Sequence, residues 1–259
     1  MSTGVAVVTG ATAGIGREFC EQLARRGHDL LLVARDQARL ADTAAALATS
    51  HRIRAEAFPA DLTRDDEVTR LAERLAATPD LALLVNNAGF GSRGRLAESD
   101  AGMQEAMVRL HTLAPMRLTR AALPVLLGAG RGAIVNVSSV ASFVYSAGNV
   151  NYCATKAYLT TFTEGLAAEL HGSGVQAQAL CPGFTRTEFH ARIGQPLERH
   201  PEFAWMRASS VVAYSLRCLD RGGPTVCIPG LGYRVLVGLI RLTPRALLGW
   251  YTRRRYDRV

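Results

Sequence analysis

The sequence predicts a single α/β domain built on a doubly wound parallel sheet. Short runs of Val, Ile and Leu alternate along the chain with segments whose apolar residues recur at helical spacing. The runs are continuously apolar, which is typical of parallel strands buried on both faces. A chain of 259 residues, 48% of them hydrophobic, suits one large domain. We expect residues 1–230 to form this domain and residues 231–259 to extend it as a short C-terminal helical tail.

The expected strands follow one another in chain order. Each is a short run rich in β-branched residues or leucine, of the length that a buried strand needs. They comprise residues 5–9, 29–34, 81–87, 132–139, 175–181 and 224–229.

Helices are expected between these strands. Ile15, Phe19 and Leu23 are four residues apart on one face, and Gly27 ends this first helix. Because crossovers between parallel strands are right-handed, the helices will cover both faces of the sheet. The other expected helices comprise residues 36–49, 64–77, 100–127 and 151–171.

The composition excludes several classes of protein. The net charge is +8, but most arginines are scattered and no basic run carries interleaved aromatics, so we expect no nucleic-acid partner. The five cysteines include no CxxC pair, which argues against a disulfide framework and a metal site. The first apolar run leads straight into a turn, and no run of about 18 apolar residues follows, so neither a signal peptide nor a spanning helix is expected. A cytoplasmic location fits best.

The turn after the first strand has the sequence TGATAGIG. Gly10 permits a tight turn, and Gly14 and Gly16 let a pyrophosphate approach the backbone at the N-terminus of the first helix. An ordinary glycine-rich turn is the alternative. The position between a first strand and a first helix favours the dinucleotide site.

The end of the second strand indicates which dinucleotide binds. A site selective for NAD has an acidic residue there, on the ribose 2′-hydroxyl. This chain has Ala34 followed by Arg35, whose guanidinium suits a 2′-phosphate, and Arg17 offers a second charge. Arg35 as one more solvated arginine is the alternative, but the pattern favours NADP.

A tyrosine and a lysine stand four residues apart in the helix over 151–171. Of the 30 lysine and arginine residues, only Lys156 is a lysine, and it shares a helix face with Tyr152. A nearby ammonium lowers the high pKa of a phenol toward the range useful for acid–base chemistry. Ser139, at the carboxyl end of a strand, can donate to a substrate carbonyl, and Ser138 competes for that role. Side chains alternate along a strand, so only one of the two serines can serve.

Six motifs in order resemble the short-chain dehydrogenase/reductase family of the Rossmann-fold superfamily. They are TGATAGIG, Asp61-Leu62, NNAG over 86–89, NVSS over 136–139, the Tyr152-CAT-Lys156 segment, and PGFTRT over 182–187. The resemblance spans about residues 4–230.

This resemblance implies a role for each matched residue. Ser139 polarises the carbonyl, Tyr152 donates the proton, and Lys156 binds the nicotinamide ribose and depresses the tyrosine pKa. The implied NADP-binding residues are Gly10, Thr12, Gly14, Ile15, Gly16, Arg35, Asp61, Leu62, Asn87, Ala88, Gly89, Tyr152, Lys156, Pro182, Gly183, Thr185 and Thr187.

One position departs from the family pattern. His111 stands where these enzymes usually carry an asparagine that holds a helix kink and a water linked to the lysine. A histidine could hold that water through a ring nitrogen and titrate near neutrality, as a fourth catalytic residue. It could also be a tolerated polar substitute with slower proton supply, or the site could be inactive.

The expected substrate loops are mostly apolar, which favours an apolar ketone or secondary alcohol. They contribute Phe90, Gly91, Phe143, Val144, Tyr145, Phe189, His190, Ile193, Trp205 and Met206.

The tail predicts two short amphipathic helices, the second with Thr243 as N-cap and Pro244 at its first position. It could fold over the subunit or its partner, or touch an anionic membrane.

The sequence thus predicts an NADP(H)-dependent oxidoreductase. An NADP-binding regulatory or sensor protein with little turnover is the alternative. The resemblance also implies a homodimer or homotetramer formed through the two long helices.

Overall fold

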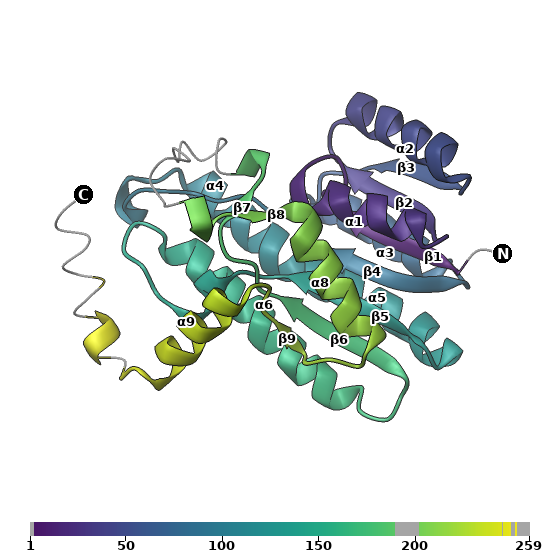
Figure 1. Ribbon diagram of the computed structural model, residues 1–259. Helices are drawn as coiled ribbons and strands as arrows, with labels where there is room; N and C mark the ends of the chain where they lie inside the picture. The colour runs from purple at the N-terminus through teal and green to yellow at the C-terminus, as the bar shows by residue number, and fades with distance from the viewer. Residues whose placement is uncertain (1–2, 190–201, 245, 250–251, 253–259) are drawn as a thin grey trace.

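A seven-stranded, all-parallel sheet organises the chain in the computed structural model, which describes residues 3–189, 202–244, 246–249 and 252 (Figure 1). The strand order is β3-β2-β1-β4-β5-β6-β9, so the chain reverses direction across the sheet between β1 and β4. Ligands of doubly wound sheets bind beside such a reversal, at the carboxyl ends of the strands. The strands are β1 (Val5–Thr9), β2 (Asp29–Ala34), β3 (Ala55–Pro59), β4 (Leu81–Asn86), β5 (Gly132–Val137), β6 (Val175–Leu180) and β9 (Val226–Cys227).

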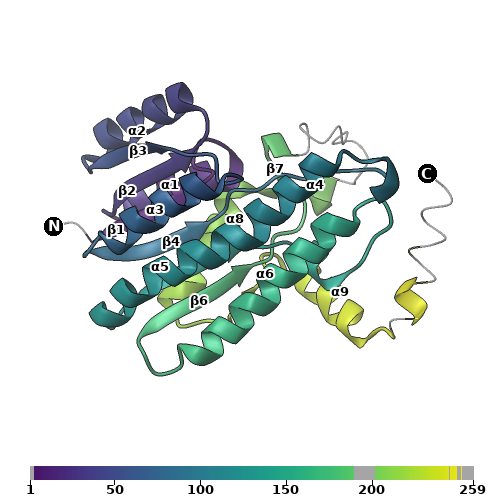
Figure 2. The ribbon, with the colours of Figure 1, turned by 180° about the vertical axis from the view of Figure 1, so that it is seen from behind.

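Helices cover both faces of the sheet, as doubly wound topology requires. α1, α2 and α8 lie on one face, and α3, α5 and α6 lie on the other, which Figure 2 shows from behind. The helices are α1 (Gly14–Arg25), α2 (Gln37–His51), α3 (Asp65–Ala76), α4 (Ala101–Val108), α5 (Ala114–Ala129), α6 (Val150–Glu169), α8 (Ala208–Asp220) and α9 (Leu231–Leu242).

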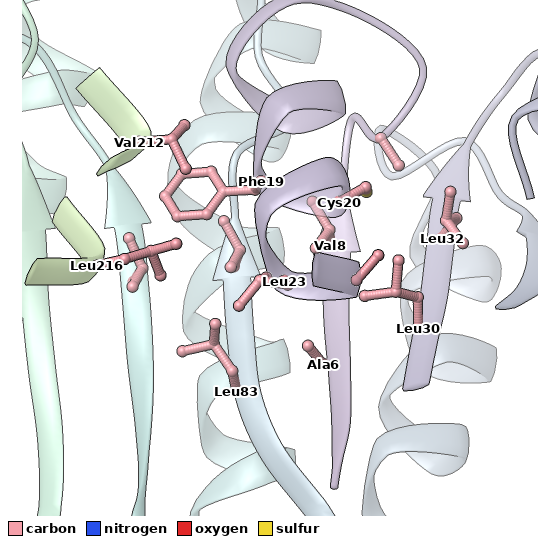
Figure 3. Close-up of a cluster of buried hydrophobic side chains, with 14 of the residues drawn as sticks. Ala6, Val8, Phe19, Cys20, Leu23, Leu30, Leu32, Leu83, Val212 and Leu216 are labelled. Atoms are coloured by element: carbon pink, nitrogen blue, oxygen red, sulfur yellow. The ribbon is translucent and has the colours of Figure 1, made fainter. Parts of the chain in front are cut away.

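The hydrophobic core on the α1 side follows from the spacing of apolar residues. Phe19 and Leu23, one turn apart on α1, are buried against Val212 and Leu216, which are four apart on α8 (Figure 3). The side chain of Val8 on β1 closes this core from the sheet. Full burial of each large side chain contributes roughly 1.5–3 kcal/mol, so this layer fixes α1 relative to the strand ends.

The predicted doubly wound α/β fold is confirmed, with differences where local pattern was weak. Strand β3 was not predicted, because AEAFP alternates and ends in proline, as edge strands can. Helix α8 was also missed. The strand expected over 224–229 shrinks to two residues, and the one expected over 132–139 ends at Val137.

The helix expected over 100–127 is interrupted. Between α4 and α5 the backbone forms a π-helical turn, Arg109–Leu113, with His111 at its centre. Such single π turns frequently mark functional sites. A short parallel pair, β7 (Thr185–Arg186) and β8 (Met206–Arg207), lies outside the main sheet.

The tail begins with α9, as expected. Residues 246–249 continue in helical conformation, and Pro244 accepts backbone hydrogen bonds from Leu247 and Leu248. Thr243 Oγ1 donates to the carbonyl of Leu239 in the preceding turn, at 2.8 Å. No helix in the described part of the chain is long and apolar enough to cross a membrane.

Candidate active site

One large cavity opens at the carboxyl ends of the strands, with a volume of about 1880 Å³. It runs from the turn after β1 past β4 and β5 to α6. Most of the residues that the sequence singled out lie around it. They are Gly10, Thr12, Gly14, Ile15, Arg35, Asp61, Leu62, Asn87, Ala88, Gly89, Ser139, Tyr152, Lys156, Pro182, Gly183, Thr185 and Thr187.

Gly16 is an exception and corrects an expectation. It does not line the cavity; a Cβ there would lie 2.2 Å from the Gly10 carbonyl oxygen and 2.3 Å from Asn87 Nδ2. Gly16 therefore allows α1 to pack closely against the strand ends. Gly10 and Gly14 do face the cavity, and both have positive φ, 67° and 52°. Only these two glycines shape the turn toward a ligand.

Thr9 joins the glycine turn to the NNAG segment, a role that the sequence did not reveal. Its buried Oγ1 accepts the backbone N–H groups of Asn87 and Ala88 at 2.9 and 3.0 Å and lies 3.3 Å from the Val85 carbonyl. The Asn87 amide returns a hydrogen bond to the Thr9 carbonyl at 2.8 Å. These hydrogen bonds fix the glycine turn after β1 relative to the NNAG segment after β4.

The basic residues at the far end of the cavity differ partly from expectation. Arg35 lines it, at the end of β2, but Arg17 does not. Arg39, in the first turn of α2, lines it instead. Its guanidinium forms a two-point ion pair with Glu188, at 2.5 and 3.2 Å. This pair joins α2 to the segment after β7, so one side chain missed by the sequence reaches across the cavity.

The structure decides between the two serines. Ser138 is buried, and its Oγ bonds to the Lys156 carbonyl at 2.9 Å and to Thr160 Oγ1 at 2.7 Å. Ser139 faces the other way: its Oγ accepts the Ala141 N–H at 3.1 Å and hydrogen bonds to Tyr152. Ser139 is therefore the serine beside the tyrosine, although the strand ends before either residue.

On α6, Lys156 is buried and Tyr152 is half-buried. The ammonium Nζ donates to the Val137 carbonyl at 2.8 Å and lies 5.8 Å from the centre of the Tyr152 ring. Burial lowers the pKa of Lys156 to about 8, because desolvation disfavours its charged form.

The tyrosine corrects a second expectation. Burial raises the pKa of Tyr152 to about 12, and the hydrogen bond from Ser139 offsets only part of that rise. The expected depression of this pKa by Lys156 is not what the structure has. Desolvation disfavours the charged phenolate and is the largest contribution to this pKa.

His111 corrects a third expectation. The ring is buried in the π-helical turn behind Gly89, where a Cβ would lie 2.8 Å from Nε2. Nε2 accepts the Phe90 N–H at 3.1 Å, and Nδ1 lies 3.1 Å from Thr155 Oγ1. Burial, assisted by the charge of Lys156, lowers the pKa of His111 well below its usual value. Titration near neutrality is therefore wrong, and the ring is a fixed spacer outside the cavity lining.

The apolar end of the cavity includes part of the expected substrate set. Phe90, Gly91, Val144, Tyr145 and Phe189 line it. Phe143, Trp205 and Met206 do not, and His190 and Ile193 lie outside the described residues. The tail supplies apolar wall that the sequence did not predict, from Leu236 and Ile240 on α9 and from Leu248.

Comparisons with known proteins agree with this architecture. A family model described as short chain dehydrogenase matches residues 4–198. A short-chain dehydrogenase from Sphingobium yanoikuyae, solved in complex with NADPH, is 38% identical, with a TM-score of 0.84 over 92% of this chain and 94% of that one. The bulky-bulky ketone specific alcohol dehydrogenase from Comamonas testosteroni is 32% identical, with a TM-score of 0.79 over 94% of this chain and 96% of that one.

A sequence relative extends the comparison. The 3-oxoacyl-(acyl-carrier-protein) reductase of Aquifex aeolicus is 30% identical over 196 residues, 75% of this chain and 79% of that protein. The family model, the Rossmann-type sheet and these relatives agree. The chain belongs to the short-chain dehydrogenase/reductase family of oxidoreductases.

Proposed function

We propose that this protein is an NADP(H)-dependent oxidoreductase that interconverts an apolar ketone and a secondary alcohol. The observation that carries the proposal is the grouping of Ser139, Tyr152 and Lys156 on the wall of one cavity that also contains the glycine turn. A phenol, a hydroxyl and an ammonium at one end of a dinucleotide cavity are the groups that carbonyl reduction requires.

The cavity fits an NADP molecule by its shape and charge. A side chain at Gly14 would meet Thr187 at 3.0 Å, so the glycines leave a narrow cradle for a pyrophosphate. Ala13 precedes α1 and has no polar side chain to cap its first turn, whose N–H groups are suited to phosphate. Arg35 supplies positive charge where a 2′-phosphate would lie, and Arg39, paired with Glu188, lines the same cavity. The relative from Sphingobium yanoikuyae, solved with NADPH, supports this assignment.

The reaction then divides between the cofactor and three side chains. A bound NADP(H) would supply or accept the hydride through its nicotinamide ring. Ser139 Oγ donates a hydrogen bond to the carbonyl oxygen, and Tyr152 passes its phenolic proton to that oxygen in the reduction. Lys156 uses one N–H on Val137, and its other two N–H groups are available to ribose hydroxyls of the cofactor. In the oxidation the tyrosine takes the proton back.

The apolar end of the cavity supports a substrate with bulky groups on both sides of the carbonyl. Phe90, Val144 and Phe189 line the cavity together with Leu236 and Ile240 of α9. Apolar wall of this kind favours burial of a hydrophobic substrate over a sugar or a charged acid. The relative from Comamonas testosteroni, named for bulky-bulky ketones, supports this class.

We also propose a homodimer or homotetramer formed through α5 and α6. Leu113, which directly precedes α5, is 44% exposed, and Tyr158 on α6 is 41% exposed and stacks on Phe162 with ring centres 5.8 Å apart. Light scattering of the purified chain measures this directly.

A panel of ketones with NADPH and with NADH tests the proposed activity. We expect turnover of diaryl and aryl-alkyl ketones with NADPH, and none with Tyr152→Phe, which lacks the proton donor. Tight NADPH binding without turnover across the panel would instead indicate a regulatory NADP-binding protein.

A further inference from the structure

Helix α9 presents an apolar stripe away from the protein. Leu231, Val235, Leu239 and Leu242 recur at intervals of four, four and three residues and therefore share one face. Their side chains are 68%, 55%, 59% and 83% exposed. We refer to these four residues as the α9 stripe. A row of large aliphatic side chains this exposed marks a contact surface.

The opposite side of α9 holds the helix in place, so the direction of the stripe is set. Val237 is buried, and the Tyr233 hydroxyl accepts the Phe184 N–H at 3.0 Å and donates to the Ala204 carbonyl at 2.7 Å. The Arg241 guanidinium lies 4.8 Å from the centre of the Phe143 ring. α9 lies beside α6 (Figures 1 and 2), and its Leu236 and Ile240 line the cavity.

In sequence, most of the chain's excess positive charge falls in the segment that begins with this stripe. Residues 231–259 contain seven arginines, one aspartate and no glutamate or lysine, whereas the whole chain carries a net charge of +8. Most of the excess positive charge therefore belongs to the last ninth of the sequence. Arg234 and Arg241 belong to α9 itself, which has no acidic residue, although Arg241 lies 3.9 Å from the Glu164 carboxylate of α6.

We propose that the α9 stripe docks on an anionic lipid surface. An interfacial helix combines an exposed apolar face with arginines that interact with lipid phosphates. A second copy of the chain fits less well, because a two-fold contact through α9 would bring two strongly cationic segments together. The apolar face and the positive charge are both matched by a bilayer that contains acidic lipids.

Docking there has a consequence for substrate access, which rests on the proposed function. Leu236 and Ile240 face the cavity from the same helix that carries the stripe. The cavity mouth would then open at the lipid surface, where apolar ketones concentrate.

Co-sedimentation of the full chain with vesicles tests the docking without using catalysis. The vesicles are phosphatidylcholine alone, or phosphatidylcholine with about a third of phosphatidylglycerol. We expect binding to the anionic vesicles that weakens as salt is raised, and little binding to the neutral ones. Leu239→Gln/Leu242→Gln should lower the partition constant by about tenfold or more, since burying one leucine contributes at least that factor. Leu127→Gln, at an exposed leucine on α5, should bind as the wild type does.

Several results would overturn the proposal. The first is that the wild type binds neither kind of vesicle, and the second is that the double variant binds as well as the wild type. The third is that the double variant forms a smaller oligomer in light scattering while neither protein binds vesicles. The last would assign the stripe to contacts between copies. Turnover of a small soluble ketone, measured without vesicles, reports on the proposed enzymatic function separately, so each can fail alone.

Discussion

The imidazole of His111 connects the loop after β4 to helix α6, because its Nε2 accepts the backbone N–H of Phe90 at 3.1 Å. An accepting nitrogen carries no proton, so the neutral ring is protonated on Nδ1, which donates to Thr155 Oγ1 at 3.1 Å. Thr155 then donates to the Tyr152 carbonyl at 3.0 Å. Both ring nitrogens have protein partners, which leaves neither to hold a water.

His111→Asn should therefore leave the pH dependence of kcat/KM unchanged between about pH 5 and 8, where an ordinary histidine titrates. Burial lowers the pKa of His111 well below its usual value, so the ring is neutral near pH 7 and has no proton to lose there. The variant should lose about 1–3 kcal/mol of stability, because a buried N–H loses its acceptor. An inflection that disappears from the rate profile in the variant would restore the proton relay.

Arg35→Ala should weaken NADPH binding by about 10- to 150-fold and leave NADH binding unchanged. The fold-change corresponds to a charge-assisted contact with the 2′-phosphate, worth roughly 1.5–3 kcal/mol. Fluorescence titration of both cofactors measures it. Arg17→Ala is the matched control and should bind both cofactors normally, because Arg17 lies outside the cavity lining. An equal loss of NADPH affinity in both variants would show that the cofactor responds to the net charge of the protein and not to a direct contact with Arg35.

Lys156→Arg should lose roughly 100-fold in turnover, although the charge is kept. Lys156 is buried with Nζ 2.8 Å from the Val137 carbonyl, and a planar guanidinium cannot occupy that position without displacement. A shift of about 1 Å can cost this factor. Steady-state kinetics at saturating NADPH measures it, with circular dichroism to verify the fold and Tyr152→Phe as the fully damaging reference. Turnover within about threefold of the wild type would contradict the prediction.

The buried lysine also predicts how stability varies with pH. The pKa of Lys156 falls to about 8 on folding, from about 10.4 in an unfolded chain. Between these values the unfolded chain binds more protons, so the free energy of unfolding rises with pH, by about 3 kcal/mol for this group. Below pH 8 the buried lysine is charged in the folded protein, and the full cost of its desolvation lowers the free energy of unfolding. Urea titrations at pH 8 and 10 should show this rise in the wild type relative to Lys156→Met, and parallel pH dependences would contradict it.

Tyr233→Phe should destabilise the protein by about 1–3 kcal/mol and weaken NADPH binding. The change removes a hydroxyl that accepts the Phe184 N–H and donates to the Ala204 carbonyl. The first of these hydrogen bonds holds the loop over 182–187. Tyr158→Phe, at a half-exposed tyrosine on α6, is the control and should stay within about 0.5 kcal/mol. Urea unfolding and cofactor titration measure the two effects. Reduced stability with unchanged cofactor affinity would limit Tyr233 to a structural role.

Local sequence patterns predicted the doubly wound sheet, the glycine turn and the pairing of Tyr152 with Lys156, and the family resemblance added Ser139 to that pair. The patterns are continuous apolar runs, helical spacing, and short motifs whose residues lie next to one another in the chain. Strand β3 and helix α8 were not predicted, because their local patterns are weak and contacts with distant segments stabilise them.

The tertiary structure decided what depends on contacts between distant segments. It separated Ser138 from Ser139, assigned Gly16 to packing instead of ligand contact, and brought Arg39 to the cavity in place of Arg17. The pKa of Tyr152 is raised where the sequence predicted a lowered one, and the pKa of His111 is lowered below the neutral range. Both follow from desolvation, which depends on all the atoms around a group and not on its neighbours along the chain. Spacing can bring two residues together, but only the complete packing determines how much water each retains.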